Sequence, residues 1–197
     1  MDINSNIILL TPGYVRDIGS VNDRPIGFPD GFFVEDYNFD GSGDYLSATT
    51  ASALGTGDWT VEYWVWHDEF GSNQIHLAFG TYAPAFYYRH SSSTFKFSFY
   101  QQSAGLSGNV WTTYAPTPNK WYHLAWVHDD SENKLALFVN GAFWGDVTYT
   151  GNTTSTSLRV GDDTTSAWMN GNLSLIHISE PTRRRGSSYA VICLKKK

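Results

Sequence analysis

The chain has 197 residues, of which 41% are hydrophobic and 16% aromatic, so it can bury a core and is not disordered throughout. No apolar run approaches the roughly 18–20 residues needed to span a bilayer, which excludes a membrane-embedded protein. Residues 1–172 carry 7 basic and 18 acidic residues, a net charge of −11, and this balance argues against binding nucleic acid through its phosphates.

Residues 1–36 are rich in Gly, Pro, Asp and Asn and show no sustained hydrophobic period, which predicts a loose N-terminal leader. The apolar stretch 7–10 is too short for a secretion signal, so we expect either another export route or a missing natural start. The single cysteine, Cys193, lies near the C-terminus, so neither disulfides nor thiolate metal sites are expected in the body of the chain.

From Tyr37 onward the sequence changes to short β-type runs separated by turn residues. The Asn140-Gly141 pair is the sharpest turn signal, because both residues tolerate the positive φ of a tight hairpin. The predicted strands are Tyr45–Ala48, Trp59–His67, Gln74–Phe79, Phe86–Arg89, Phe95–Tyr100, Val110–Tyr114, Trp121–His128, Leu135–Val139, Phe143–Tyr149 and Leu158–Val160.

Ten short strands with regular turns and no helical period predict an all-β sandwich of two sheets, or a barrel. Aromatic residues occupy both alternating faces of Trp59–Trp66. This pattern indicates that at least one sheet is covered on both sides or has a concave aromatic face.

The composition changes after about residue 172. The run Leu173–Arg183 resembles a translated transposase sequencing adapter, and the similarity continues toward the C-terminus except at Ser187 and Ile192. We therefore predict that 173–197 is a non-native tail and that the domain lacks its native last strand, with Leu173, Ile176 and Ile178 standing in for it. The alternative is a natural basic tail that binds an anionic surface.

Three segments in order carry a family resemblance: Asn38–Leu46, Leu54–Val65, and Lys120–His128 followed by Leu135–Gly141. They resemble the laminin-G-like branch of the concanavalin A-like lectin/glucanase jelly rolls, and Leu158–Asp163 and Met169–Asn172 are similar to its closing segment. The resemblance implies an antiparallel two-sheet jelly roll over residues 37–172. It is weak evidence for function, because this scaffold carries many ligands.

Glycan hydrolysis is disfavoured by the carboxylates. Retaining glucanases of this superfamily carry a Glu-x-Asp-x-x-Glu run on one strand, which sets acid and nucleophile about 5–5.5 Å apart. The chain contains no such run, and Glu62 lies four residues after Asp58 and seven before Glu69. We therefore expect a protein that is not an enzyme.

Metal binding has only weak candidates. Asp36–Gly41 matches the opening of a calcium loop, but position twelve is Ser47, so a strand entering a turn is the preferred interpretation. Calcium is possible at the aspartates in two turns, which are Asp129, Asp130, Asp162 and Asp163. The histidines show no paired metal spacing, and we expect structural roles for His123 and His128.

Carbohydrate binding has a firmer basis, because the apolar faces of sugar rings pack on aromatic rings while polar side chains bind the hydroxyls. The candidates near predicted strand ends are Tyr88, Arg89, Trp111, Trp144, Asp162 and Trp168. We expect a recognition or adhesion module for a glycan or surface protein, in a virion or at a microbial cell surface. The alternative is a purely architectural domain without a small ligand.

Overall fold

The computed structural model describes residues 36–50, 53–80, 84–91, 94–101, 106–110, 116–162, 167–179 and 195–196. Within these ranges all the regular secondary structure is β-strand. No helix that is long and apolar enough to cross a membrane occurs there. The strands are β1 (Asp36–Asp40), β2 (Leu46–Thr49), β3 (Trp59–His67), β4 (Gln74–Phe79), β5 (Ala85–Ser91), β6 (Thr94–Gln101), β7 (Leu106–Val110), β8 (Trp121–Asp129), β9 (Lys134–Val139), β10 (Ala142–Thr148), β11 (Ser157–Val160), β12 (Asn170–Ser179) and β13 (Lys195–Lys196).

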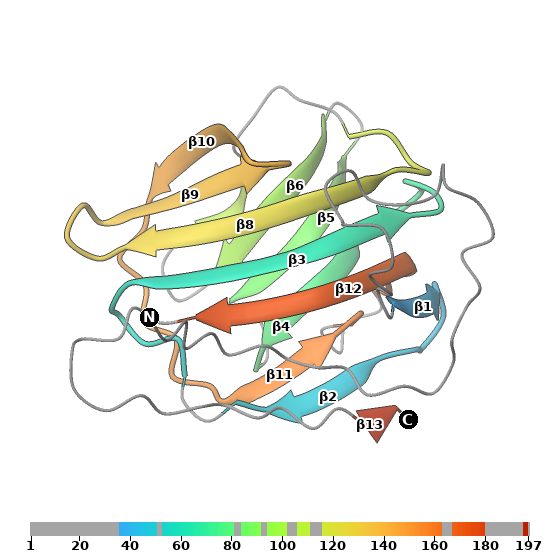
Figure 1. Cartoon of the computed structure of the whole chain (residues 1–197), viewed down its shortest axis with the longest axis horizontal. Helices are drawn as coiled ribbons and strands as arrows, with labels where there is room; N and C mark the ends of the chain where they lie inside the picture. The colour runs from blue at the N-terminus through green and yellow to red at the C-terminus, as the bar shows by residue number, and fades with distance from the viewer. Residues whose placement is uncertain are drawn as a thin grey trace, which may run out of the picture.

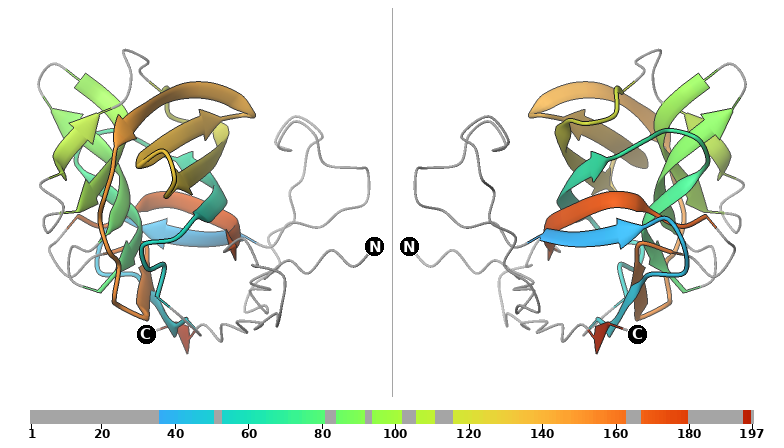
Figure 2. Two further views of the ribbon diagram at one scale, coloured as in Figure 1. Left: turned by 90° about the vertical axis from the view of Figure 1, so that its left-hand side faces the viewer. Right: turned by 90° about the vertical axis from the view of Figure 1, so that its right-hand side faces the viewer.

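The strands form two antiparallel sheets packed face to face (Figures 1 and 2). The six-stranded sheet has the order β1-β12-β3-β8-β9-β10, and the seven-stranded sheet has the order β13-β2-β11-β4-β5-β6-β7. Figure 1 looks onto the six-stranded sheet, with β4, β5 and β6 behind it. The predicted all-β, two-sheet sandwich is therefore confirmed.

The side chains of β3 and β8 alternate between the core and the outer surface of the sandwich. Side chains along β3 alternate between buried and half-buried from Trp59 to His67, and those of β8 alternate in the same way. Successive side chains of a strand point to opposite faces, so one set fills the core and the other forms an outer surface. In the register of the pair, Val61 opposes Trp126 and both are buried.

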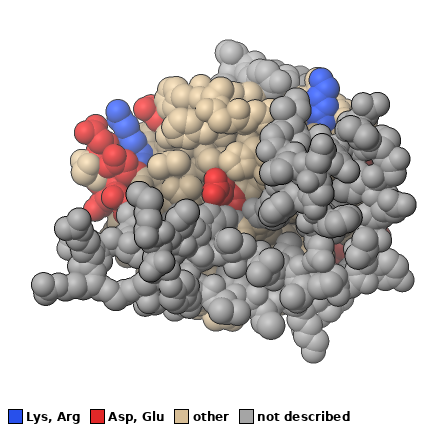
Figure 3. Space-filling view, viewed as in Figure 1, with Lys and Arg blue, Asp and Glu red and all other residues tan. Residues whose placement is uncertain are grey.

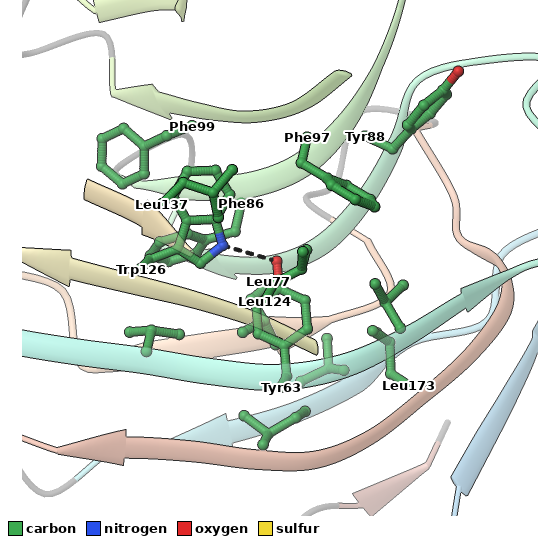
Figure 4. Close-up of a cluster of buried hydrophobic side chains, with 14 of the residues drawn as sticks. Tyr63, Leu77, Phe86, Tyr88, Phe97, Phe99, Leu124, Trp126, Leu137 and Leu173 are labelled. Carbon is green, nitrogen blue, oxygen red and sulfur yellow. Dashed lines mark hydrogen bonds between the residues drawn. The ribbon is translucent and has the colours of Figure 1, made fainter. Parts of the chain in front are cut away.

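Large aromatic side chains fill the space between the sheets (Figure 4). Phe86 of β5 contacts Trp59 and Trp126 of the opposite sheet, with ring centroids 6.2 Å and 5.6 Å away. Phe99 lies 5.2 Å from Phe86 in a T-shaped arrangement. Such pairs add about 0.5–1.5 kcal/mol each beyond the burial of apolar area.

A chain of hydrogen-bonded polar side chains also crosses this core. The indole Nε1 of Trp126 donates to the Tyr63 hydroxyl at 3.3 Å, the dashed line in Figure 4. That hydroxyl lies 2.9 Å from His76 Nδ1. His67 Nε2 lies 3.0 Å from His76 Nε2, and His67 Nδ1 lies 2.8 Å from Gln74 Oε1. All five side chains are buried, so each depends on its neighbours for hydrogen bonding.

The turns follow from residues that tolerate positive φ. Asn140 and Gly141 have φ of 51° and 77° and join β9 to β10 as a two-residue hairpin, as predicted. Asp36–Asp40 forms a strand that enters a turn, in agreement with the preferred interpretation of this segment. In that turn Gly41 has a φ of 80°, and the Asp40 carboxylate accepts a hydrogen bond from the Ser42 amide at 2.8 Å.

The segment after residue 172 completes the six-stranded sheet. β12 lies between β1 and β3, where Leu173 and Ile176 are buried in the core and Ile178 is partly buried against it. These three residues therefore occupy a strand position, as expected of a stand-in for a last strand. The derivation of 173–197 from an adapter stays a prediction.

Two other predictions concern segments only partly described. The predicted leader lies outside the described residues except for Asp36, which begins β1. The strand predicted over Val110–Tyr114 shares only Val110 with β7, which begins at Leu106, and the remainder of the predicted span lies outside the described residues.

Candidate functional site

The outer face of the six-stranded sheet carries a set of aromatic side chains. They belong to the outward-facing positions of β3, β8, β9 and β10, which alternate with the core positions of the same strands. We call this surface the aromatic face, and its members are Trp64, Trp66, Trp121, His123, Phe138 and Phe143.

The rings of the aromatic face meet as cross-strand pairs. Trp66 opposes Trp121 with centroids 6.0 Å apart, and Trp64 opposes His123 at 5.2 Å. Phe138 and Phe143 form a third pair at 5.6 Å. Their side chains are half-buried to exposed, and Phe143 remains 59% exposed. The face therefore offers ring surface that the core does not use.

Polar groups border these rings. Glu62 Oε2 lies 3.4 Å from His123 Nε2, and the Trp66 indole donates to the Asp68 carboxylate at 3.0 Å. On the next strands of the sheet, the Asn38 amide donates to the Asn172 side chain at 3.1 Å. Carboxylate, imidazole and amide groups thus lie beside aromatic rings, the combination that binds sugar hydroxyls and sugar ring faces together.

Figure 3 views this side of the molecule and shows how charge is distributed over it. Uncharged surface covers the region of β8, β9 and β10, while acidic side chains gather at the end where β8 turns into β9. Exposed Asp129, Asp130 and Glu132 lie in that turn. The aromatic face is thus largely uncharged apart from the carboxylate of Glu62 beside His123, and a group of acidic side chains lies at one end of it.

The acidic turn is organised by its own hydrogen bonds. The Asp129 carboxylate accepts hydrogen bonds from the Ser131 hydroxyl at 2.7 Å and the Glu132 amide at 3.0 Å. The hydrogen bond from Ser131, followed by that from Glu132, lowers the pKa of Asp129. The Asp130 amide donates to the Asp58 carboxylate at 2.8 Å. These contacts are those of a turn-forming aspartate.

Other candidate ligands also have partners or lie outside the structure. The Asp162 carboxylate is buried and forms an ion pair with Arg159, whose guanidinium lies 3.7 Å from the centroid of the Tyr45 ring. Asp163 lies outside the described residues. Among the residues that the structure does describe, no group of three or more His, Cys, Asp or Glu could hold a metal ion.

The sequence-predicted glycan contacts are dispersed over the fold. Tyr88 is buried in the core, where burial raises the pKa of its hydroxyl, whereas the preceding Tyr87 faces the outer side of the seven-stranded sheet. This placement follows from strand alternation, which turns neighbouring residues to opposite faces. Arg89 is half-buried on the same outer side as Tyr87.

The two predicted tryptophans that the structure describes do not gather at one place either. Trp144 packs against the core from the edge strand β10, with its ring 6.5 Å from Phe97. Trp168 is half-buried and precedes β12, while Trp111 lies outside the described residues. No single surface therefore combines the six predicted residues, and their glycan-binding role stays a prediction for those at the surface.

The sequence interpretation missed the aromatic face as a site. The sequence signal for this face was the presence of aromatic residues at both the inward and the outward positions of β3. Trp59 and Tyr63 point inward, while Trp64 and Trp66 point outward. His123, expected to be structural, lies on this face beside Glu62. His128 does have a structural place, because it is buried with Nδ1 2.7 Å from the Gly57 carbonyl oxygen.

The sequence and the fold are similar to those of known proteins. The sequence model of the Concanavalin A-like lectin/glucanases superfamily, of the laminin-G type, matches residues 40–184. The chain belongs to this superfamily. The comparison with curated protein sequences gives no match. The laminin-G-like resemblance predicted from three sequence segments is therefore confirmed.

Solved structures share this superfamily fold. The SAP-like pentraxin of Limulus polyphemus is 14% identical with a TM-score of 0.60, and the match covers 73% of this chain and 74% of the pentraxin. A Bacteroides ovatus protein inferred to bind carbohydrate is 17% identical with a TM-score of 0.59. The match covers 74% of this chain and 43% of the Bacteroides protein.

A third structure is domain 4 of the extracellular arabinanase AbnA from Geobacillus stearothermophilus, solved with arabinotriose. It is 13% identical with a TM-score of 0.54, and the match covers 75% of each chain. At these identities the likeness establishes the shared fold.

Proposed function

We propose that this domain is a non-catalytic carbohydrate-binding module that uses the aromatic face of the six-stranded sheet. The observation that carries the proposal is the half-exposed Trp66–Trp121 pair with the Trp64–His123–Glu62 group beside it. The pair supplies ring surface for the C–H face of a sugar, and the carboxylate and imidazole supply hydrogen bonds to its hydroxyls.

Fold membership supports the same proposal without naming a ligand. The superfamily includes lectins, and the arabinanase domain of similar fold was solved with arabinotriose. We further propose that the domain belongs to a virion or an exported microbial surface protein, where glycan recognition serves adhesion. That assignment is supported by the resemblance of its Gly41–Ser47 segment to domains of tailed-phage and marine microbial proteins.

The first test screens the full chain against an array of neutral plant and microbial polysaccharides, with arabinotriose as a defined soluble probe. Binding of a hit is then measured by titration calorimetry for the full chain and for Trp66→Ala and Trp121→Ala. A buried aromatic anchor contributes at least about 2 kcal/mol to binding, so each variant is expected to weaken affinity at least about thirtyfold.

Trp144→Ala is the matched control, because it removes the same side chain from a position that packs against the core. It is expected to lower stability while leaving affinity for the neutral glycan unchanged. Unchanged affinity in Trp66→Ala and Trp121→Ala would remove the aromatic face from the site. A chain that binds no glycan would favour the architectural role.

A further inference from the structure

The aromatic face carries two ring pairs at different places on the six-stranded sheet. Trp66 of β3 and Trp121 of β8 are cross-strand partners, which we call the tryptophan pair. Phe138 of β9 and Phe143 of β10 are also partners, which we call the phenylalanine pair. The register places Ala125 of β8 directly opposite Phe138, so the two pairs can be located relative to each other along β8.

The separation of the two pairs follows from strand geometry. Ala125 lies four residues after Trp121 on β8, and Phe138 lies on the next strand. A strand rises about 3.4 Å per residue and neighbouring strands lie about 4.8 Å apart, so roughly 14 Å separates the Cα atoms of Trp121 and Phe138. A single sugar ring cannot span this distance, whereas several linked sugars can.

Small and polar side chains lie between the two pairs. The half-buried Ala125 contributes only a methyl group to the outer surface. Its cross-strand neighbour on β3 is Glu62, whose carboxylate Oε2 lies 3.4 Å from Nε2 of His123. The side chains of Glu62 and His123 are 34% and 26% exposed, so both can contact sugar hydroxyls. A short polar stretch therefore joins two surfaces made of aromatic rings.

The phenylalanine pair is open to solvent. Phe143 is 59% exposed, and within the part of the chain that the structure describes it is the only large apolar side chain that is mostly exposed. Its ring lies 5.6 Å from that of Phe138, whereas Trp144 beside it packs against the core. Apolar surface of this kind, bordered by polar residues, is typical of a binding site.

The charges near this route favour an uncharged ligand. The surface over β8, β9 and β10 is largely uncharged in Figure 3. Glu62 places a carboxylate between the two pairs, and Asp129, Asp130 and Glu132 lie at one end of the face. A nucleic acid or an acidic polysaccharide would be repelled by these carboxylates, whereas a neutral glycan would not.

We propose that the aromatic face binds an extended, uncharged oligosaccharide that lies on both ring pairs at once. One sugar packs on the tryptophan pair and a more distant sugar of the same chain packs on the phenylalanine pair. The sugars between them form hydrogen bonds with Glu62 and His123 through their hydroxyls. The proposal rests on the proposed function and adds to it a required length of the glycan.

Calorimetric titration of the full chain with neutral linear oligosaccharides tests the length requirement. The ligands are arabinotriose with arabinohexaose, and xylotriose with xylohexaose. In a series that binds, the hexaose is expected to bind at least about tenfold more tightly than the triose, because only the longer chain reaches the phenylalanine pair. Phe143→Ala is expected to weaken hexaose binding about tenfold and to leave triose binding unchanged. Trp66→Ala is expected to weaken the binding of both.

Two control variants accompany these measurements. Phe143→Tyr keeps the ring and is expected to retain hexaose binding. Tyr100→Ala removes a partly buried aromatic side chain from the other sheet and is expected to bind both ligands as the unaltered chain does. Thermal unfolding of each variant confirms that it is folded.

Three results would overturn the proposal. One is equal affinity for triose and hexaose, or no binding in either series. Another is unchanged hexaose binding in both Phe138→Ala and Phe143→Ala; if Trp66→Ala still weakens binding in that case, the proposed function stands without the length requirement. The third is a dimer in light scattering that Phe143→Ala converts to a monomer, which would assign the phenylalanine pair to an interface between two copies of the chain.

Discussion

His67 and His76 face each other in the core, with their Nε2 atoms 3.0 Å apart. Both rings are completely buried, and burial lowers the pKa of each, to about 4 for His67. Neutral imidazole has one donor and one acceptor nitrogen, so the hydrogen bonds at each ring are directional.

The order of protons along this chain follows from its ends. Gln74 Oε1 can only accept, because Gln74 Nε2 donates to the Glu69 carbonyl, so His67 donates from Nδ1 and accepts at Nε2. His76 must then donate from Nε2 and accept the Tyr63 proton at Nδ1. Every link is satisfied with both rings neutral, and protonating His67 leaves two Nε2–H donors facing each other.

Stability should therefore fall as the pH falls from about 7 to about 4. In this window the unfolded chain, with a histidine pKa of about 6.5, binds more protons than the folded chain. The lowered pKa of His67 alone corresponds to about 3 kcal/mol of unfolding free energy, present above pH 6.5 and lost toward pH 4. Urea denaturation at pH 7, 5.5 and 4.5 measures the slope. An equal midpoint at all three would contradict the neutral assignment, and exposed His90 provides His90→Gln as the control that keeps the slope.

Removing the hydroxyl group from two buried tyrosines should have different effects on stability. Tyr63→Phe deprives His76 Nδ1 of its donor and Trp126 Nε1 of its acceptor, which should cost about 2 kcal/mol of stability. The Tyr88 hydroxyl is buried without a hydrogen-bond partner in the structure, so Tyr88→Phe should be neutral or stabilising. Chemical denaturation of both variants decides the matter, and equal losses would show that the polar chain contributes nothing specific.

Gly171 should not tolerate a side chain. Its φ is 136°, and a Cβ atom there would lie 2.0 Å from the carbonyl oxygen of Trp66 on β3. Gly171→Ala should therefore separate β12 from β3 and destabilise the fold by at least about 2 kcal/mol. Gly57 has open space around its Cβ position, so Gly57→Ala is the matched control and should change the melting temperature little. Comparable melting temperatures for the two variants would contradict the close approach of these strands.

Two residues of β12 should differ in their contribution to stability. Leu173→Ala leaves a cavity at a fully buried position and should cost about 2–5 kcal/mol. Ile178→Ala removes a side chain that is only partly buried and should cost less. Equilibrium denaturation of both variants measures the difference, and a small effect at Leu173 would mean that β12 is not an integral strand.

The origin of the segment after Asn172 can be tested at the DNA level. Resequencing the source DNA across codon 172 with an independent library chemistry should reveal a different continuation that encodes the native last strand. A native reading identical to Leu173–Arg183 would instead make this segment part of the natural protein.

Much of the sandwich could be predicted because its local signals agree. β3 and β4 were predicted to the residue, since turn residues flank each of these runs of aromatic and aliphatic side chains and mark their ends. The facing of β5 was harder to predict. Phe86, Tyr87 and Tyr88 are all aromatic, so hydrophobic alternation could not indicate that Tyr88 points inward and Tyr87 outward.

The site depends on pairing between distant segments, which is why the sequence did not reveal it. Trp66 and Trp121 are half-buried partners only because β3 and β8 are neighbours in a specific register. Phe138 likewise lies opposite Ala125 only through the register of β8 and β9. Composition supplied the aromatic rings, but their grouping into pairs on one face follows from the sheet order.

The position of β12 between β1 and β3 has a consequence for biosynthesis. Asn38 of β1 pairs with Asn172 of β12, which lies 134 positions later in the chain. One edge of β3 also pairs with β12. The nascent polypeptide must therefore keep two strand edges unpaired until β12 has been synthesised, during which time they can associate with neighbouring polypeptides. Production at lower temperature or with added chaperones should accordingly raise the soluble yield.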